Sequence, residues 1–426
     1  MSTNSQPLIF SGIDWGSESH RVCIVNAAGT VLGEKSFPHS GEGLHQLRDW
    51  IFDGSNCTAD QVAVAIEVPH GPVVDCFMEH GFQVFAINPK QLDRFRDRFS
   101  PAGAKDDRRD ARVLADAVQT DPNCLRRLDP VHAEIIQLRE WSRMADELTA
   151  QRTRLTHQVR EQLWRYFPQF LNLGFPLSSA VLSALWTLIP TPERARRVRL
   201  ASIEKILKRH RIRRITSEQV FTILRTTPIT MADGVQEAAT ANIRLRLQQL
   251  ALIQAQMQQA ETAMETLLET LSADVIPPPA EVDSEPAEFT SEPALCDVDI
   301  LASLPGVGTK VLATLLSEAP GLLKARDHRG LRSFCGVAPV TRQSGKTRRV
   351  IRRQAHLARL SNAVYHWSRV AVQHDPVSRA KYKALRARGH SHGRALRSVA
   401  DRLLAVACAM LRNGTRFDPS RATVAT

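Results

Sequence analysis

The sequence predicts an α/β domain at the N-terminus, a helical coiled-coil region in the middle and a mainly α-helical domain at the C-terminus. Three observations predict this division. Short apolar segments separated by turns fill about the first 90 residues, apolar residues spaced by three and four follow, and Arg dominates the charge after residue 300. A chain of 426 residues is long enough for two or three domains with cores of their own. The predicted domains are residues 1–128, 129–272 and 300–426, with a linker at 273–299.

The first part of the chain has the order of a mixed sheet. Leu8–Asp14, Arg21–Asn26 and Val31–Phe37 predict three antiparallel strands, because turn-forming residues separate them. A helix, the continuous apolar segment Val62–Glu67, another helix and the strand Phe82–Asn88 follow. A continuous apolar segment is typical of a central strand that is covered on both faces. Three antiparallel strands followed by alternating helices and strands is the order of ribonuclease-H-like folds, which include the RuvC-like ones.

Four acids of this domain lie either at the end of a predicted strand or in a predicted helix. Asp14 and Glu67 close two predicted strands, while Asp107 and Asp110 lie in the helical segment 104–120. Residues three apart share a helix face, and so do residues four apart, so spacing alone does not choose between Asp106 and Asp107 as the partner of Asp110. Taken alone, this stretch is also compatible with acids that complement a helix dipole.

Converging carboxylates predict bound cations. Two unit charges about 4 Å apart repel by roughly 4 kcal/mol at an effective dielectric constant near 20, so a fold keeps such a group only if it is neutralised. Carboxylate oxygens suit Mg²⁺, and two such ions hold a phosphoryl group during displacement. The acids therefore predict a site for two Mg²⁺ ions in a nuclease or strand-transfer enzyme.

The middle of the chain is predicted to be helical. Two apolar seams predict a coiled coil that pairs within one chain or between chains, as a homodimer or higher homo-oligomer. Between the seams, Arg194–Arg214 is a second basic cluster, which contacts nucleic acid or is simply a solvated helix face. The linker 273–299 has five Pro, eight acids and no Lys or Arg, which predicts disorder. The stronger seam is Ile243, Leu247, Leu250, Ile253, Met257, Ala260, Met264, Leu267 and Leu271, and the weaker is Leu138, Trp141, Ala145, Leu148, Leu155 and Val159.

The positive charge is concentrated in the C-terminal part. Residues 324–426 contain 4 Lys and 19 Arg against 4 Asp, a net charge of +19 in a chain whose total is +12. The first 323 residues therefore carry −7. Arg in excess over Lys favours phosphate, which it binds in a two-pronged geometry. The distribution predicts a polyanion, nucleic acid in the first place, as the partner of the C-terminal domain; the alternatives are a basic surface that only aids solubility or a basic domain that docks on the acidic part of the chain.

Two segments of this domain are candidates for DNA contact. Leu304–Lys310 reads LPGVGTK and predicts the hairpin of a helix-hairpin-helix, in which Gly306, Gly308 and Lys310 approach a phosphate. Ser344-Gly345 lies in a predicted loop; taken alone, such a pair is usually part of a turn. Basic residues surround it: Arg342, Lys346, Arg348, Arg349, Arg352 and Arg353.

Other classes of protein fit less well. The seven Cys show no CxxC pair or metal-finger spacing, which predicts reduced cysteines. No apolar segment approaches 18 residues, and the first residues lack a basic signal region, so we expect no membrane contact and a cytoplasmic, nucleoid-associated protein.

Together these motifs resemble the DEDD insertion-sequence transposases, relatives of the pilin-gene invertases that are described as bridge-RNA-guided recombinases. The resemblance rests on Ile13-Asp14, Ile66-Glu67, the segment 105–111, LPGVG, and Gly336-Val337-Ala338-Pro339 with Ser344-Gly345. It covers residues 8–170 and 300–412 in the family's order.

The resemblance implies more than the residues alone do. It implies a RuvC-like domain, a coiled coil and a transposase domain whose serine attacks DNA to form a covalent phosphoserine link. Asp14, Glu67, Asp107 and Asp110 match the metal-binding acids, and Ser344 matches the nucleophile. The resemblance also implies a guide RNA and a site whose acids and serine come from different subunits.

Three other functions remain as alternatives. A RuvC-like endonuclease or junction resolvase would use water in place of serine. An actin-like ATPase or sugar kinase would explain Asp14-Trp15-Gly16 as a phosphate loop, although a second Gly-rich loop is missing. A non-enzymatic nucleic-acid-binding scaffold would leave the four acids unexplained.

Overall fold

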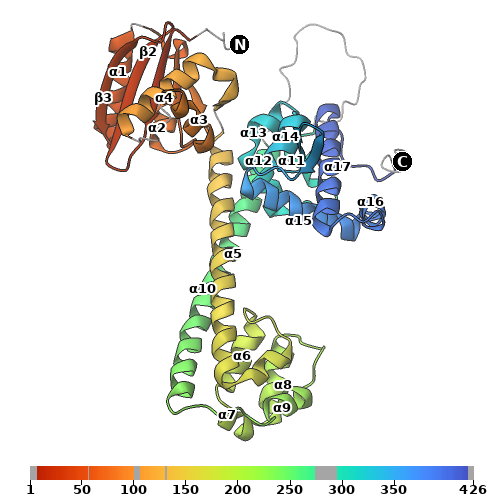
Figure 1. Cartoon of the computed structure of the whole chain (residues 1–426). Helices are drawn as coiled ribbons and strands as arrows, with labels where there is room; N and C mark the ends of the chain where they lie inside the picture. Colours follow the sequence, from red (N-terminus) through yellow and green to blue (C-terminus); the bar gives the residue numbers. More distant parts are fainter. Residues whose placement is uncertain (1–6, 56, 100–105, 130–131, 274–294, 421–426) are drawn as a thin grey trace, which may run out of the picture. The chain divides into compact units, whose positions relative to one another are not determined.

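The computed structural model describes residues 7–55, 57–99, 106–129, 132–273 and 295–420 (Figure 1). The chain forms two compact units, Met1–Val131 and His132–Thr426. Most of the predicted linker, 274–294, and the residues before Asp106 in the predicted helix 104–120 lie outside the described residues. No helix in the described part of the chain is both long and apolar enough to cross a membrane.

The first unit is built on a mixed sheet, which confirms the predicted α/β class. The sheet has the order β3-β2-β1-β4-β5-β6. The first three strands form an antiparallel meander, β1, β4 and β5 are parallel, and β6 pairs with β5 in the antiparallel sense. The strands are β1 Ile9–Asp14, β2 Ser19–Asn26, β3 Val31–Pro38, β4 Val62–Ile66, β5 Gln83–Ala86 and β6 Arg126–Arg127.

Helices cover both faces of this sheet. Side chains alternate along a strand, so Ile9 and Ile13 join one core and Phe10 joins the other. The first core includes buried residues of α1 (Gly41–Ser55) and α2 (Pro72–Glu79), and the second includes those of α3 (Pro89–Phe99) and α4 (Asp107–Thr120). Short 3₁₀ turns lie at Ala59–Gln61 and Pro122–Cys124.

Gly12 sets how closely α4 approaches the sheet. A Cβ added at Gly12 would lie 2.0 Å from the carbonyl oxygen of Ala111 and 2.4 Å from the amide nitrogen of Ala115. The helix backbone therefore packs directly on β1, which only glycine permits. This contact places the first turn of α4 beside the C-terminal end of β1.

The second unit contains a pair of long antiparallel helices, α5 (Ala133–Tyr166) and α10 (Val235–Ala273). Leu138 shares a core with Met264, and Val159 shares another with Ile243, so the two predicted seams face each other. The sequence left open whether the seams pair within or between chains. In the structure they pair within the chain.

A helical insert, residues 167–234, connects α5 to α10 and shares one core with the adjoining parts of these two helices. Phe167, Phe170, Leu185 and Ile203 are among its buried residues. Its elements are a 3₁₀ segment at Pro168–Leu173, α6 Ala180–Leu188, α7 Pro192–Arg197, α8 Leu200–Arg209 and α9 Ser217–Leu224.

The remainder of the second unit is mainly helical and packs around Trp367, which is fully buried. One expectation was wrong: the segment around Ser344, predicted as a loop, is a β-hairpin. The elements are α11 Asp297–Ala302, α12 Thr309–Glu318, α13 Pro320–Lys324, α14 His328–Phe334, β7 Val340–Ser344, β8 Thr347–Ile351, α15 Ala358–His374, α16 Pro376–Ala387 and α17 His392–Asn413.

Candidate active site and nucleic-acid interface

Asp14 and Glu67 lie at neighbouring ends of two parallel strands. In the pairing of β1 with β4, Ile13 is opposite Ile66, so the residue that follows each of them is an acid, Asp14 after β1's Ile13 and Glu67 after β4's Ile66. Both acids are half-buried. Adjacent parallel strands bring their carboxyl ends to the same edge of the sheet, and the two acids therefore share that edge.

Strand alternation places both acids toward α4. On β1, Asp14 continues the side of Phe10 and Gly12, and on β4, Glu67 continues the side of Ala63 and Ala65. Glycine and alanine on this side leave room for α4 to approach. The sheet thus directs two acids to the face on which the helix supplies the others.

The first turn of α4 gives its acids different environments. Asp106 is the N-cap residue, and its side chain accepts a hydrogen bond from the amide nitrogen of Arg109 at 3.0 Å. Asp107 is exposed, whereas Asp110 is only 1 % exposed. Asp106 therefore has a local structural role, as the cap of α4, that Asp107 does not share.

Arg96 on α3 neutralises Asp110. Its Nε donates to Oδ1 of Asp110 at 2.5 Å and its Nη2 donates to Oδ2 at 2.8 Å, while Nη1 donates to Asp93. The hydrogen bonds from Arg96 to Asp110 are the main cause of the raised pKa of Arg96, and the charge of Glu67 also contributes. Arg96 thus carries a positive charge into the group of acids.

The acids fit a divalent cation by chemical type, and two of them, Asp14 and Glu67, share one edge of the sheet. They supply carboxylate oxygens, the ligands that Mg²⁺ prefers, and three of the four are wholly or partly buried. As the side chains stand, both oxygens of Asp110 are bound by Arg96, and no three acids, His or Cys among the described residues are close enough to hold a metal. Arg96 provides the neutralising charge in this arrangement.

The LPGVG segment forms the turn between α11 and α12. Gly306 has a φ of +82°, and a Cβ there would lie 2.8 Å from the backbone nitrogen of Ala371 on α15. The indole nitrogen of Trp367 donates to the carbonyl of Pro305 at 2.9 Å. Packing against α15 thus accounts for the glycine at 306. Gly308, which caps α12, and Lys310 are exposed.

Ser344 is the last residue of β7 and lies beside a two-residue turn. It pairs with Thr347, and Gly345 has a φ of +53°, a conformation that glycine adopts easily. All residues from 341 to 350 are exposed, which includes Arg342, Lys346, Arg348 and Arg349. Residues 328–374 contain no acid, so no carboxylate neighbouring in sequence neutralises these cations.

A further basic cluster lies after the hairpin. The pKa of Arg397 on α17 is lowered by burial and by the positive charges of Arg352 and Arg394. Arg353 has a buried Nε without a hydrogen-bond partner in the described residues. Arg359, in contrast, pairs with Asp146 at 2.9 Å and with Glu318, so it joins α15 to the rest of the unit. The cluster of Arg352, Arg394 and Arg397 suits an anion.

Sequence reasoning missed Arg96, Arg394 and Arg397. Arg96 lies three residues after Asp93 on a helix, a spacing that indicates only a local pair. Its contact with Asp110 depends on how α3 packs against α4. Arg394 and Arg397 lie in an Arg-studded helix, in which spacing does not distinguish an anion site from a solvated face.

Acids at adjacent strand ends of an α/β sheet, with a basic and mainly helical second unit, are the arrangement expected of a DNA transposase of the DEDD type. Residues 11–168 match a DEDD family of IS110-type elements described as "Transposase", and residues 298–383 match the family described as "Transposase IS116/IS110/IS902 family". The chain belongs to this family of insertion-sequence transposases, enzymes that cut and rejoin DNA. Membership implies dependence on a divalent metal.

Individual relatives support this assignment. The chain is 31% identical over 424 residues to the "Mini-circle putative transposase for IS117" of Streptomyces coelicolor, covering 97% of this chain and 96% of the relative. It is 25% identical over 422 residues to an IS110 43.6 kDa protein of the same organism, covering 96% and 95%. A match to "Putative transposase y4uE" of Sinorhizobium fredii is 54% identical over 206 residues, 48% of this chain but only 57% of that protein's length.

Proposed function

We propose that this transposase cuts DNA with Ser344 as nucleophile and forms a covalent phosphoserine–DNA intermediate. The observation that carries the proposal is the position of Ser344, exposed at the end of β7 among cations and without a carboxylate nearby in sequence. A serine hydroxyl is a weak nucleophile, and neighbouring positive charge favours its alkoxide. The same cations can hold the phosphate that is attacked.

The proposed step conserves the phosphodiester bond energy. The serine oxygen bonds to phosphorus, one phosphorus–oxygen bond to deoxyribose breaks, and that sugar oxygen leaves as a hydroxyl with the proton that serine gave up. A hydroxyl of another strand can then attack the serine ester and release Ser344. Cutting and rejoining therefore need no other reactant.

We further propose that Asp14, Glu67, Asp107 and Asp110 bind Mg²⁺, two ions in all, within a RuvC-like domain. Such ions would neutralise the charge on the phosphate during the reaction. The shared sheet edge of Asp14 and Glu67 and the burial of Asp110 support this ligand set. Asp110→Asn should abolish cutting and leave DNA binding intact, a result that a non-enzymatic scaffold would not give.

DNA contact is proposed at residues of the second unit, most of them exposed, with residues 300–426 forming its transposase domain. Arg342, Lys346, Arg348 and Arg349 lie on the hairpin, while Arg352 and Arg353 follow it. Gly308 and Lys310 are proposed at the start of α12, where a helix N-terminus suits a phosphate. Gly306 is proposed only as part of that turn, since it packs against α15.

We also propose a guide RNA and a homo-oligomer as partners. The resemblance to the bridge-RNA-guided family supports the RNA, and sequencing of RNA that copurifies with the protein tests it. Exposed Leu245 and Leu252, seven residues apart on α10, support an oligomer through the outer face of the coiled coil.

A nicked suicide substrate tests the nucleophile. Once one strand is cut, a short fragment diffuses away and rejoining is blocked, so a serine intermediate accumulates. We expect protein linked to DNA for the wild type and for Thr347→Ala, the hydroxyl opposite Ser344 on the hairpin. We expect none for Ser344→Ala. Cut DNA without linked protein would instead support a nuclease that uses water.

A further inference from the structure

The helical insert, residues 167–234, lies outside both segments that match the transposase family, 11–168 and 298–383, apart from its first two residues. Its charge is unusual. Residues 194–213 contain nine Lys and Arg against one acid, Glu204, and all nine basic side chains are exposed. We call these nine side chains the basic surface.

Packing explains why these side chains point outward. On α8, Ile203 and Leu207 are buried, which leaves Lys205, Lys208 and Arg209 on the outer side. After α8, Ile212 packs on the core of the insert while Arg211 and Arg213 are exposed. Apolar side chains are thus turned inward and basic side chains outward, both in α8 and in the residues that follow it.

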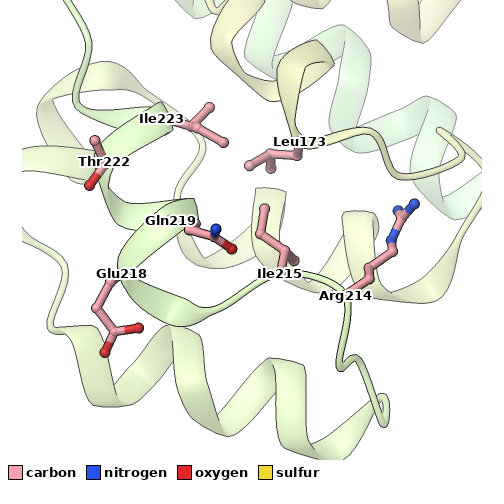
Figure 2. A pocket seen from close by; sticks show the side chains of 7 residues that line it. All are labelled: Leu173, Arg214, Ile215, Glu218, Gln219, Thr222 and Ile223. Carbon is pink, nitrogen blue, oxygen red and sulfur yellow. The ribbon is translucent and has the colours of Figure 1, made fainter.

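Two arginines next to this surface, Arg214 and Arg225, have structural roles. Arg225 donates to the carbonyl of Ala195 at 3.0 Å and stacks on Phe221, with the guanidinium carbon 3.7 Å from the ring centre. Arg214 donates to the carbonyl of Gly174 at 2.7 Å and lines an open hollow of about 540 Å³ with Ile215 and Gln219 (Figure 2). Both residues join elements of the insert.

The basic surface has no comparable partners. Within the described residues, the ion pair that it makes is Lys208 to Glu204, at 2.6 Å. Arginines near α12, such as Arg143 and Arg359, pair with acids. Arg196 also lies close enough to Glu193 for its charge to help lower the pKa of that carboxyl. Nine basic side chains still exceed these two acids, and positive charge in such excess attracts a polyanion, while Arg in excess over Lys favours phosphate.

We propose that the basic surface binds the phosphate backbone of duplex DNA, as a contact separate from the catalytic parts. Proteins that bind single strands stack bases on exposed aromatic rings. In residues 167–234, all of which the structure describes, none of Phe167, Phe170, Phe175, Trp186 and Phe221 is exposed; the exposed Trp164 lies before the insert, on α5. The surface therefore suits a duplex backbone, and DNA is the substrate of the family. The proposal does not depend on the serine mechanism.

Two triple variants of the full-length protein test the proposal. One removes three charges from the basic surface, by Arg209→Gln, Arg211→Asn and Arg213→Gln; asparagine tolerates the positive φ of residue 211. The control removes three exposed charges from α5, by Arg154→Gln, Arg160→Gln and Arg165→Gln. Binding to a duplex DNA without Mg²⁺ is measured by fluorescence anisotropy over a range of salt concentrations.

For the surface variant we expect the slope of log K against log salt to fall in magnitude by about 2 to 3, since each phosphate contact contributes roughly 0.9. Affinity should fall about tenfold or more, and the control should resemble the wild type. Equal losses in both variants, an unchanged surface variant, or loss of RNA binding alone would each overturn the proposal.

A second measurement uses only the wild-type protein, so it does not depend on whether a variant folds. Lys205 and Lys208 of the wild type are acetylated with and without duplex DNA, and the modified peptides are quantified by mass spectrometry. We expect DNA to slow the modification of both lysines several-fold. Unchanged rates at saturating DNA would overturn the proposal, whatever the outcome for Ser344.

Discussion

Arg96 and Asp110 form a two-pronged ion pair, Nε to Oδ1 at 2.5 Å and Nη2 to Oδ2 at 2.8 Å, on a carboxylate that is almost fully buried. The pair joins α3 to the first turn of α4. It also uses both oxygens of an acid that we propose as a metal ligand. Arginine and metal would therefore compete for Asp110.

Replacement of Arg96 tests this competition. Arg96→Gln leaves a buried carboxylate without its cation, and we expect the free energy of unfolding to fall by about 3 kcal/mol. Added Mn²⁺ should raise the melting temperature of this variant more than that of the wild type, because the ion can take the place of arginine. The control is Arg94→Gln, an exposed residue of the same helix. Equal metal-dependent shifts in all three proteins would contradict the competition.

Gly12 is predicted to tolerate no side chain. Gly12→Ala places a Cβ 2.0 Å from the carbonyl oxygen of Ala111, so α4 must move away from β1. We expect a loss of about 3 kcal/mol in the free energy of unfolding and loss of DNA cutting. Gly41→Ala, where a Cβ meets no atom within 4 Å, should change neither by much. Chemical denaturation and a cutting assay measure both effects.

His20 predicts a pH dependence of stability. Its ring is buried and contacts His39, Nε2 to Nδ1 at 2.9 Å, and burial followed by the charge of His39 lowers its pKa. Below about pH 6.5 the unfolded state takes up a proton at this histidine, while the folded state keeps His20 neutral. The contribution of His20 to the free energy of unfolding is therefore fully present above about pH 6.5 and is lost as the pH falls below that value. We expect a shallower fall for His20→Gln. The same slope in both proteins between pH 7.5 and 5.5 would show that His20 is not responsible.

Division of the site between subunits predicts complementation. Asp14→Ala and Ser344→Ala should each be inactive, because each removes one part of the site. If acids and serine come from different protomers, a mixture of the two variants should recover part of the recombination activity. The comparison is each variant mixed with itself at the same total concentration. Activity that stays absent in every mixture would argue for a site within one protomer.

The sequence predicts those features that apolar patterns encode. β1 and β4 have continuous buried segments, and the seams of α5 and α10 keep a regular spacing, so both were predictable. The hairpin was missed because residues 341–349 contain no apolar residue, so strand pairing leaves no periodic signal in them. The partner of Arg96 was missed because it is set by packing between helices. No motif in the sequence predicted the fold of the insert.

The measurement that tests the central claim most directly is the identification of the residue bonded to DNA. Protein trapped on the nicked substrate would be digested with protease and nuclease, and the nucleotide-bearing peptide located by mass spectrometry. We predict a phosphodiester on the peptide that contains Ser344, and on no other hydroxyl of the hairpin. A nucleotide attached to another residue, or efficient cutting without any adduct, would contradict the account.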